Sequence, residues 1–198
     1  MNKLIVASNN SHKINEIKSI LKGSSIEVLS LNDINLDIDV EETGKTFKDN
    51  ALIKALEINK LTNLPVISDD SGLEVFALNK EPGIYSARYA GLHKSDEDNN
   101  ALLLEKLSGI EKREAQYVCA VALVINQDEY YLEEGYLKGE IIDEKRGNNG
   151  FGYDPIFYLP AFQRTVAEID ANLKNRISHR AEALEKIKKV IGRLDHES

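Results

Sequence analysis

The chain has 198 residues, and 25 Lys or Arg against 33 Asp or Glu give it a formal net charge of −8. We expect residues 1–198 to form one domain with two lobes, and the balanced composition excludes disordered and collagen-like proteins. The acidic balance argues against a nucleic-acid polymer as partner, because such binding depends on neutralised phosphates. It permits a small phosphate ligand held by a few cations.

The sequence also indicates the cellular location. Cys119 is the single cysteine, which excludes an intramolecular disulfide and a cysteine-rich zinc site and suits a reducing compartment. The N-terminus turns polar at Ser8, too early for the apolar core of a signal peptide. The longest apolar stretch, 118–125, falls far short of the roughly 20 residues of a membrane helix. We therefore expect a cytoplasmic protein without a membrane partner.

The first elements alternate between strand and helix. Apolar and β-branched residues predict a strand over 3–8, and apolar residues at helical spacing predict a helix over 14–21. A second strand is expected over 26–31, followed by an acidic surface loop over 32–43.

A second helix and a third strand follow. Thr46 and Asp49 resemble a capping box, and the apolar stripe after them predicts a helix. Residues 65–68 form a short apolar strand that runs into the polar residues 69–72, and the extended pattern resumes over 73–75. We therefore expect acidic residues to interrupt this strand.

The second half of the chain contains a hairpin between two helices. Ser95 can cap a helix that reaches Leu107, and alternation over 117–125 and 130–139 predicts an antiparallel hairpin. Ser178 can cap a last helix that we expect to end at Gly192. Strands that alternate with helices, together with one long hairpin, predict an α/β fold with a mixed sheet.

Several common catalytic motifs are not present in full. Gly44-Lys45-Thr46 resembles the end of a P-loop, but Asp39 occupies the position of the required first glycine. The four histidines are scattered, and no nucleophile elbow occurs. We therefore do not expect hydrolysis through zinc or a covalent serine.

Six polar residues follow the first expected strand and open the first expected helix: Ser8, Asn9, Asn10, Ser11, His12 and Lys13. Free N–H groups at a helix N-terminus attract an anion, and the lysine adds a full positive charge. The alternative is an ordinary helix cap followed by a surface lysine.

Two pairs of adjacent carboxylates, Glu41-Glu42 and Asp69-Asp70, are candidates for a metal site. Neighbouring carboxylates repel one another unless a cation compensates, and Mg²⁺ prefers one or two carboxylates with phosphate oxygens and water. A solvated acidic loop would explain Glu41-Glu42 equally well. It explains Asp69-Asp70 less well, because that pair directly continues an apolar strand.

Residues 147–155 combine three glycines with Phe151 and Tyr153. Glycines let a flat ligand approach the backbone, and aromatic rings can stack on a base. The alternative is a glycine-rich connection with Phe151 in the core.

A basic group, Lys174, Arg176, His179 and Arg180, is expected beside the N-terminus of the last helix. Cations at that end oppose the helix dipole, so an external anion would explain them better than helix stability does. A solvated basic face is the alternative.

Taken together, the motifs resemble the inosine/xanthosine triphosphate pyrophosphatases, house-cleaning enzymes for noncanonical purine nucleoside triphosphates. The resemblance runs in order through Ser8-Asn9-Asn10 with Lys13, Glu41-Glu42-Thr43-Gly44, Ser68-Asp69-Asp70-Ser71-Gly72, residues 82–89, residues 150–155 and Ser178-His179-Arg180. The chain departs from the family pattern at Asn9 and Asn148-Asn149, where many members carry glycine, and neither change removes a charge.

The resemblance implies hydrolysis of ITP, dITP or XTP to the monophosphate and pyrophosphate with Mg²⁺. It implies an elongated mixed β-sheet with flanking helices forming two lobes around a central cleft, in a homodimer. It assigns Ser8 to Lys13 to the phosphates, Asp70 to catalysis, and Glu41 with Asp70 to the metal. The other implied substrate contacts are Ser71, Phe151, Gly152, Tyr153, Asp154, Lys174, His179 and Arg180.

The residue chemistry agrees with such a reaction. Attack of water at the α-phosphorus needs positioning and charge neutralisation more than covalent catalysis. Asp70 could serve as general base, as metal ligand or as both. A regulatory nucleotide-binding module without catalysis is the alternative, and a third interpretation moves hydrolysis to damaged pyrimidine or ordinary triphosphates.

Overall fold

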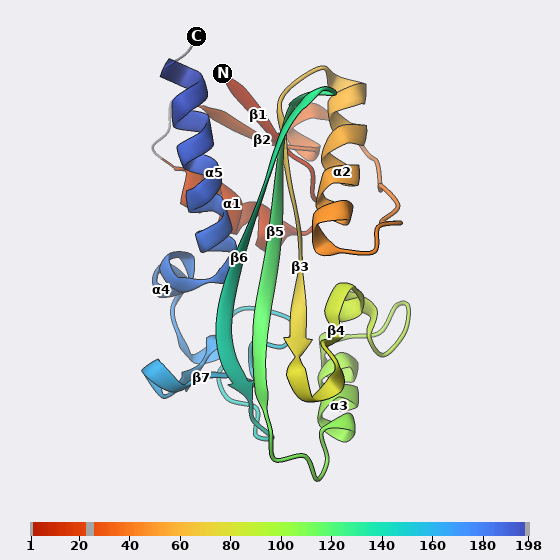
Figure 1. Ribbon diagram of the computed structural model, residues 1–198, viewed down its shortest axis with the longest axis vertical. Helices are drawn as coiled ribbons and strands as arrows, with labels where there is room; N and C mark the ends of the chain where they lie inside the picture. The colour runs from red at the N-terminus through yellow and green to blue at the C-terminus, as the bar shows by residue number, and fades with distance from the viewer. Residues whose placement is uncertain (1, 23–25, 197–198) are drawn as a thin grey trace. The chain divides into compact units, whose positions relative to one another are not determined.

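The computed structural model describes residues 2–22 and 26–196. Its helices are α1 (Ser11–Leu21), α2 (Phe47–Thr62), α3 (Asp96–Lys106), α4 (Ala171–Ile177) and α5 (His179–His196). Its strands are β1 (Lys3–Val6), β2 (Glu27–Ser30), β3 (Val66–Val75), β4 (Glu81–Pro82), β5 (Glu114–Asn126), β6 (Glu129–Ile141), β7 (Phe157–Leu159) and β8 (Arg164–Thr165). The chain is therefore an α/β protein, as its strand and helix pattern predicts (Figure 1).

The eight strands found among the described residues belong to one mixed sheet. Seven of them follow the order β2-β1-β3-β5-β6-β7-β8, and β4 pairs with β3 outside this path. β1 pairs in parallel with β2 and β3, whereas the β3–β4, β6–β7 and β7–β8 pairs are antiparallel. β5 and β6 are neighbours joined by a two-residue turn, which is too short to connect parallel strands, so the two strands are antiparallel. The predicted mixed sheet and hairpin are confirmed.

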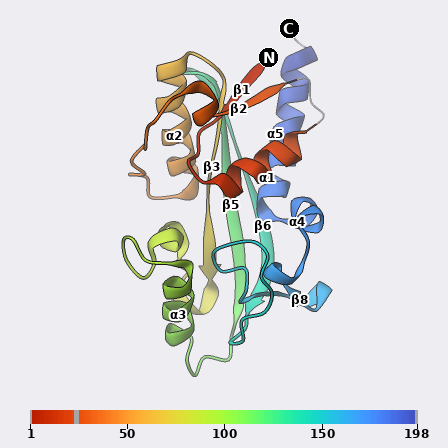
Figure 2. The ribbon, with the colours of Figure 1, turned by 180° about the vertical axis from the view of Figure 1, so that it is seen from behind.

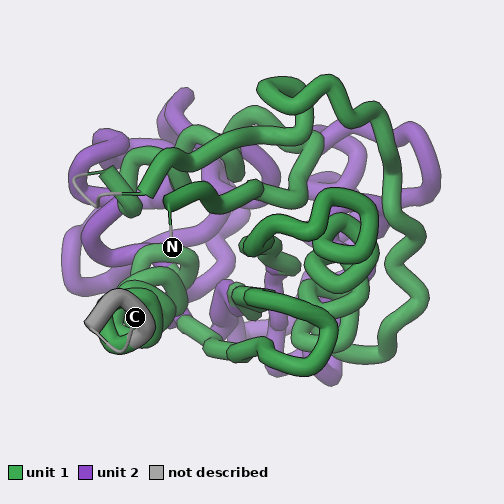
Figure 3. The backbone as a smooth tube through the Cα atoms, turned by 90° about the horizontal axis from the view of Figure 1, so that it is seen from above, with its two compact units in different colours: residues 1–70, 119–135, 179–198 green, residues 71–118, 136–178 purple. Residues whose placement is uncertain are grey.

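The chain divides into two compact units (Figure 3). Unit 1 comprises residues 1–70, 119–135 and 179–198, and unit 2 comprises residues 71–118 and 136–178. The strands β3, β5 and β6 each contribute residues to both units. The interpretation of 1–198 as a single domain stays a prediction.

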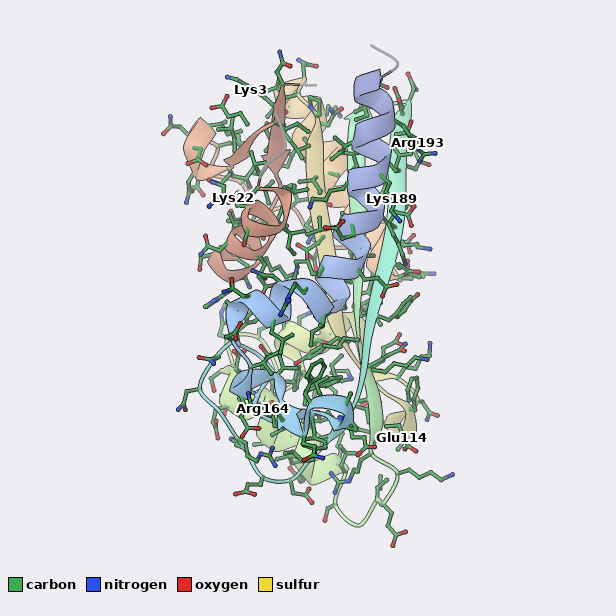
Figure 4. The ribbon with its side chains drawn as sticks, turned by 90° about the vertical axis from the view of Figure 1, so that its left-hand side faces the viewer. Lys3, Lys22, Glu114, Arg164, Lys189 and Arg193 are labelled. Atoms are coloured by element: carbon green, nitrogen blue, oxygen red, sulfur yellow. The ribbon has the colours of Figure 1, made fainter. Side chains whose placement is uncertain are left out.

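In unit 1, α1 and α5 pack against one face of the sheet. Their apolar residues share a core with Leu4 of β1, Ile67 of β3 and Leu123 of β5. Figures 1 and 2 show α2 on the opposite side of these strands from α1 and α5. The outer face of α5 is polar, with Lys189 and Arg193 exposed to solvent (Figure 4).

Unit 2 has a separate core at the open end of the β5–β6 hairpin, far from the turn. It joins Leu73 of β3, Leu103 of α3, Tyr117 of β5 and Phe157 of β7, with residues of the preceding glycine-rich loop. Ring stacking links Tyr117 and Phe157, whose centroids are 4.4 Å apart. Residues 150–154 lie against this core, and Tyr153 is one of its buried members.

Two expected boundaries are wrong. β3 runs without interruption through residues 69–72, because neighbouring side chains hold the two aspartates and the strand can continue. α5 continues past Gly192, which does not adopt the positive φ that would end a helix. The capping boxes at Thr46 and Ser95 are confirmed. Among the described residues, no helix is long and apolar enough to cross a membrane.

Candidate active site

β3 places Asp69 and Asp70 on opposite faces of the sheet. Successive side chains of a strand alternate in direction, so two adjacent aspartates meet different helices. Asp69 contacts residues of α1 and α5, whereas Asp70 contacts α2. The pair is therefore divided between two environments, although both side chains are buried.

Asp69 is the centre of a buried ionic cluster. Its Oδ2 lies 3.2 Å from Lys13 Nζ and accepts hydrogen bonds from Arg180 Nη2 at 3.0 Å and Nε at 3.2 Å. Burial acts to raise the pKa of this carboxyl, but Lys13, Arg180 and Lys54 outweigh it and hold the pKa well below its usual range. Oδ1 of the same residue has no hydrogen-bond partner among the described residues.

The loop between β1 and α1 positions Lys13. Asn10 caps α1, and its side-chain oxygen accepts from the backbone N–H groups of His12 and Lys13 at 3.0 and 3.2 Å. The Asn10 N–H donates to Ser8 Oγ, and Asn9 Nδ2 donates to the Ile38 carbonyl. The backbone N–H groups of His12 and Lys13, which were expected to be free for an anion, therefore donate to the Asn10 side chain. The lysine is not a surface residue, because its side chain is only 15% exposed.

Arg180 forms ion pairs with two acidic residues of unit 1. Besides Asp69, its guanidinium contacts the carboxylate of Glu16 on α1. His179 opens α5 beside it and is also buried. Both residues stand at the N-terminus of α5 as expected, and the carboxylates of the protein balance the arginine charge.

Lys174 and Arg176 precede the N-terminus of α5, but they belong to a separate helix. Both lie in the last turn of α4, a helix that the sequence pattern does not reveal, and so they complement a helix dipole rather than oppose it. α4 escapes prediction because its seven residues are too few to establish an apolar stripe.

Asp70 lies on the α2 side of β3. Its Oδ2 accepts from Asn50 Nδ2 at 3.0 Å, and the Asn50 side-chain oxygen accepts from the Gly44 N–H at 2.8 Å. Burial and the charge of Glu42 raise the pKa of Asp70 above its ordinary value, against the opposing charges of Lys13 and Lys54. A carboxylate in this setting has an increased affinity for a proton, as a general base requires.

Lys54 of α2 connects the acidic loop to β3. Its Nζ lies 2.8 Å from Glu42 Oε1 and donates to the Asp69 carbonyl at 2.7 Å. Glu41, the expected metal ligand, is exposed on the same loop, and Glu42 is the member of the pair that reaches this cluster. Lys54 was not among the residues expected at the site, and Glu42 was expected only as a member of the carboxylate pair.

The donor set fits a magnesium ion that relies on its substrate for further ligands. Within residues 2–22 and 26–196, no group of three His, Cys, Asp or Glu side chains is placed so that it could hold a metal ion. Mg²⁺ normally takes one or two carboxylates with phosphate oxygens and water. Asp70, whose buried carboxylate has a raised pKa, and a glutamate of the 41–42 pair satisfy that requirement.

Unit 2 contains the second group of expected site residues. Asp154 Oδ2 accepts from Lys174 Nζ at 2.9 Å and from the Phe151 N–H at 3.0 Å. The Lys174 ammonium also lies 4.6 Å from the centre of the Phe151 ring. Asp154 and Lys174 therefore contact each other and the backbone or ring of Phe151. Both charged groups are buried, and Phe151 is partly exposed.

The remaining expected residues support this loop. Gly152 has a φ of 63°, and its N–H donates to Asp96 while its carbonyl accepts from Asn100. Tyr153 is buried and donates its hydroxyl to the Ser86 carbonyl at 2.8 Å. Ser71 lies partly buried in β3.

Comparisons with known proteins agree with this fold. The model of the Ham1 family matches residues 4–190. A Clostridium perfringens protein named dITP/XTP pyrophosphatase is 49% identical over 196 residues, covering 95% of this chain and 96% of that protein. A Staphylococcus aureus protein of the same name is 50% identical over 184 residues, covering 93% of each.

Solved structures give the same result. The Staphylococcus aureus Ham1 protein matches with a TM-score of 0.87 and 46% identity, covering 100% of both chains. A HAM1 protein from Coxiella burnetii matches with a TM-score of 0.90 and 43% identity, covering 98% of this chain and 100% of that one. Both the mixed sheet and its flanking helices are thus shared with known structures.

Proposed function

Because the chain belongs to the Ham1 family, we propose that it hydrolyses noncanonical purine nucleoside triphosphates, namely dITP, XTP and ITP, to the monophosphate and pyrophosphate. The observation that carries the mechanism is the buried Asp70, held between cationic and acidic groups at the α2 face of β3. The reaction removes these nucleotides from the pool.

In this proposal Asp70 accepts a proton from the attacking water. The oxygen of that water bonds to the α-phosphorus, the bond from the α-phosphorus to the bridging oxygen breaks, and pyrophosphate leaves. Asn50 fixes the carboxylate by donating to its Oδ2. The raised pKa gives Asp70 greater proton affinity than an exposed aspartate has.

Lys13, Lys54 and the loop of residues 8–13 would bind the phosphates. Both lysines already face carboxylates across short distances, so they are oriented by the protein before a triphosphate arrives. Added negative charge at this position would be compensated by two cations whose side chains are already largely removed from water.

We assign Mg²⁺ to Asp70 and Glu41, with Glu42 as the neighbouring carboxylate. The ion would supply charge neutralisation for the phosphate oxygens and the leaving group. Glu41→Gln and Glu42→Gln form a matched pair of variants that decides between the two glutamates. The variant that requires more Mg²⁺ for half-maximal activity identifies the ligand.

The purine base is assigned to the Phe151–Asp154 loop with Ser71 and Lys174, and His179 and Arg180 are further proposed substrate contacts. Phe151 offers a partly exposed ring, and the loop offers backbone N–H groups that can donate to the oxygen at C6 of hypoxanthine or xanthine. Adenine carries an amino group there, which would leave those donors unpaired.

A pyrophosphate-release assay with Mg²⁺ across ITP, dITP, XTP, ATP, GTP and CTP tests the proposal. We expect release from the first three at kcat/KM values far above those of the others. Release of orthophosphate alone, a preference for ATP or CTP, or binding of ITP without turnover would overturn it. The last result would identify a binding module.

We further propose a cytoplasmic homodimer. A single buried cysteine suits a reducing compartment, and Phe76, Tyr85 and Leu92 of unit 2 are exposed apolar groups that a second copy could cover. Light scattering after size exclusion should give twice the mass of the chain, and a monomer at micromolar concentration would contradict this assignment.

A further inference from the structure

Tyr117 is a buried polar residue that the proposed mechanism does not use. It lies in β5 within the core of unit 2, and its side chain is only 7% exposed. Its ring stacks on Phe157 at an interplanar angle of 26°. Phe157 in turn packs closely over Gly139 of β6, where an added Cβ would meet the ring at 2.5 Å. Phe157 therefore supports one face of the Tyr117 ring and limits its movement.

The fixed ring directs its hydroxyl to Asp154. The Tyr117 O–H donates to Asp154 Oδ1 at 3.0 Å, whereas Lys174 and the Phe151 N–H bind Oδ2. The two carboxylate oxygens thus have separate partners. A carboxylate held at one oxygen only could rotate about its terminal bond, but one held at both has a single orientation.

We propose that Tyr117 is a positioning residue for base recognition. By holding Oδ1, it keeps Oδ2 of Asp154 directed at Lys174 and at the backbone of Phe151, so that the aromatic ring and the ammonium group are preorganised for the purine. This inference rests on the proposed function, because it concerns the loop assigned to the base. It adds a residue outside the glycine-rich motif to that assignment.

The Tyr117 hydroxyl is one of several groups that influence the pKa of Asp154. Burial raises the pKa of this carboxyl, while Lys174, the Phe151 N–H and the Tyr117 hydroxyl each act to lower it. Tyr153 and Asp96 are the other titratable groups that face Tyr117. Burial and these acidic neighbours raise the pKa of Tyr117 well above its ordinary value, so the phenol stays a neutral donor.

Tyr117→Phe keeps the stacked ring and removes only the donor. We expect the KM for ITP to rise about tenfold, as for a lost hydrogen bond to a charged group, while kcat changes less than about twofold. The acidic limb of the kcat/KM profile should move to higher pH, because Asp154 then protonates more readily. Tyr131→Phe is the matched control, since it removes a phenol–carboxylate bond to Glu129 in unit 1.

A double-mutant cycle separates positioning from packing. If Tyr117 acts through Asp154, adding Tyr117→Phe to Asp154→Asn should cause little further increase in KM. Equal increases in both backgrounds would show that the hydroxyl acts independently of Asp154, and an unchanged KM in the single variant would show that Tyr117 contributes only the packing of its ring. Either result would overturn the proposal.

An activity-independent measurement keeps the inference separate from the proposed function. Carbon-13 NMR of the Asp154 carboxyl should give a higher pKa in Tyr117→Phe than in the wild type, and an unchanged titration would overturn the inference. Absence of pyrophosphate release by the wild type would refute the proposed function, and the titration would still report on Tyr117. Thermal unfolding of each variant confirms that the compared proteins are folded.

Discussion

At the scale of single residues, the contrast between Asp69 and Asp70 defines the site. Two chemically identical neighbours have pKa values moved in opposite directions, down for Asp69 and up for Asp70. Because β3 alternates in direction, Asp69 lies against the cations of α1 and α5. At Asp70, burial and the charge of Glu42 outweigh the opposing charges of Lys13 and Lys54. The lowered pKa favours the ionised form of Asp69, and the raised pKa of Asp70 suits the role of proton acceptor that we propose for it.

Asp70→Asn tests that division. The amide keeps the shape of the side chain but cannot accept a proton as a base, so we expect kcat to fall about 10³-fold, equivalent to ~4 kcal/mol of barrier. The measurement is steady-state pyrophosphate release from ITP. Asp128→Asn, in the exposed turn between β5 and β6, is the control and should keep wild-type activity. More than about a tenth of the wild-type rate in Asp70→Asn would remove Asp70 from the catalytic role.

Cys119 gives a second prediction at this scale. Burial, as the largest influence, raises the pKa of its thiol to about 12, and the side chain is fully enclosed in the core of unit 1. We expect iodoacetamide to leave the native protein unmodified at pH 8 and to alkylate it stoichiometrically in denaturant, as measured by intact-mass spectrometry. Rapid alkylation of the native protein would show that this core opens readily.

At the scale of elements, α2 shows how much of the site the sequence could reveal. The capping box at Thr46 and the apolar stripe predict the helix correctly. Asn50 and Lys54 fall among the apolar positions of the same stripe, and polar residues there mark buried partners. These polar positions can be seen in the sequence, but their partners cannot, because a single sequence does not specify which strand residues the helix faces.

The continuous strand β3 could not be predicted from its local sequence. Its sequence indicates an interrupted strand, because unpaired aspartates disfavour strands. The compensating cations come from Lys13 and Arg180, which are 56 and 111 residues away along the chain. Such distant compensation overrides local propensity and has no local sequence signal.

Lys13→Ala tests the connection between α1 and β3. The substitution removes one of the cations that compensate the buried Asp69 and leaves Arg180 as its direct ion-pair partner, so we expect the free energy of unfolding to fall by about 2 kcal/mol. The kcat/KM for ITP should fall more than tenfold. Chemical denaturation and steady-state kinetics measure the two effects.

Lys48→Ala is the matched control for Lys13→Ala. It removes a 3.0 Å ion pair to Glu134 at a largely exposed position of the same unit, and such pairs contribute at most about 1 kcal/mol. Equal stability losses in both variants would contradict a special role for the buried pair. An unchanged kcat/KM in Lys13→Ala would remove this lysine from phosphate binding.

At the scale of the whole molecule, the class of fold was predictable, whereas its small elements were not. Alternating strands and helices with one long hairpin predict the mixed sheet that the structure contains. The short strands β4, β7 and β8 and the helix α4 have two, three, two and seven residues, too few for periodicity. β7 and α4 contribute residues to the core of unit 2, and β4 and β8 pair with β3 and β7. Local patterns do not encode these tertiary contacts.

The stability of the molecule in acid should depend on Asp69. A carboxyl whose folded-state pKa lies below its unfolded value, about 3.9, stabilises the native state fully above that unfolded value. Its contribution falls as the pH drops from about 4 toward the folded-state pKa, because the unfolded chain then binds the proton more tightly. Asp69→Asn removes this contribution and leaves Lys13 and Arg180 partly uncompensated, so we expect a loss of about 3 kcal/mol at pH 7. The difference in unfolding free energy between wild type and variant should shrink between pH 4 and pH 2, measured by urea denaturation at each pH. A difference that stays constant over that interval would show that the cations do not hold Asp69 ionised in the native state.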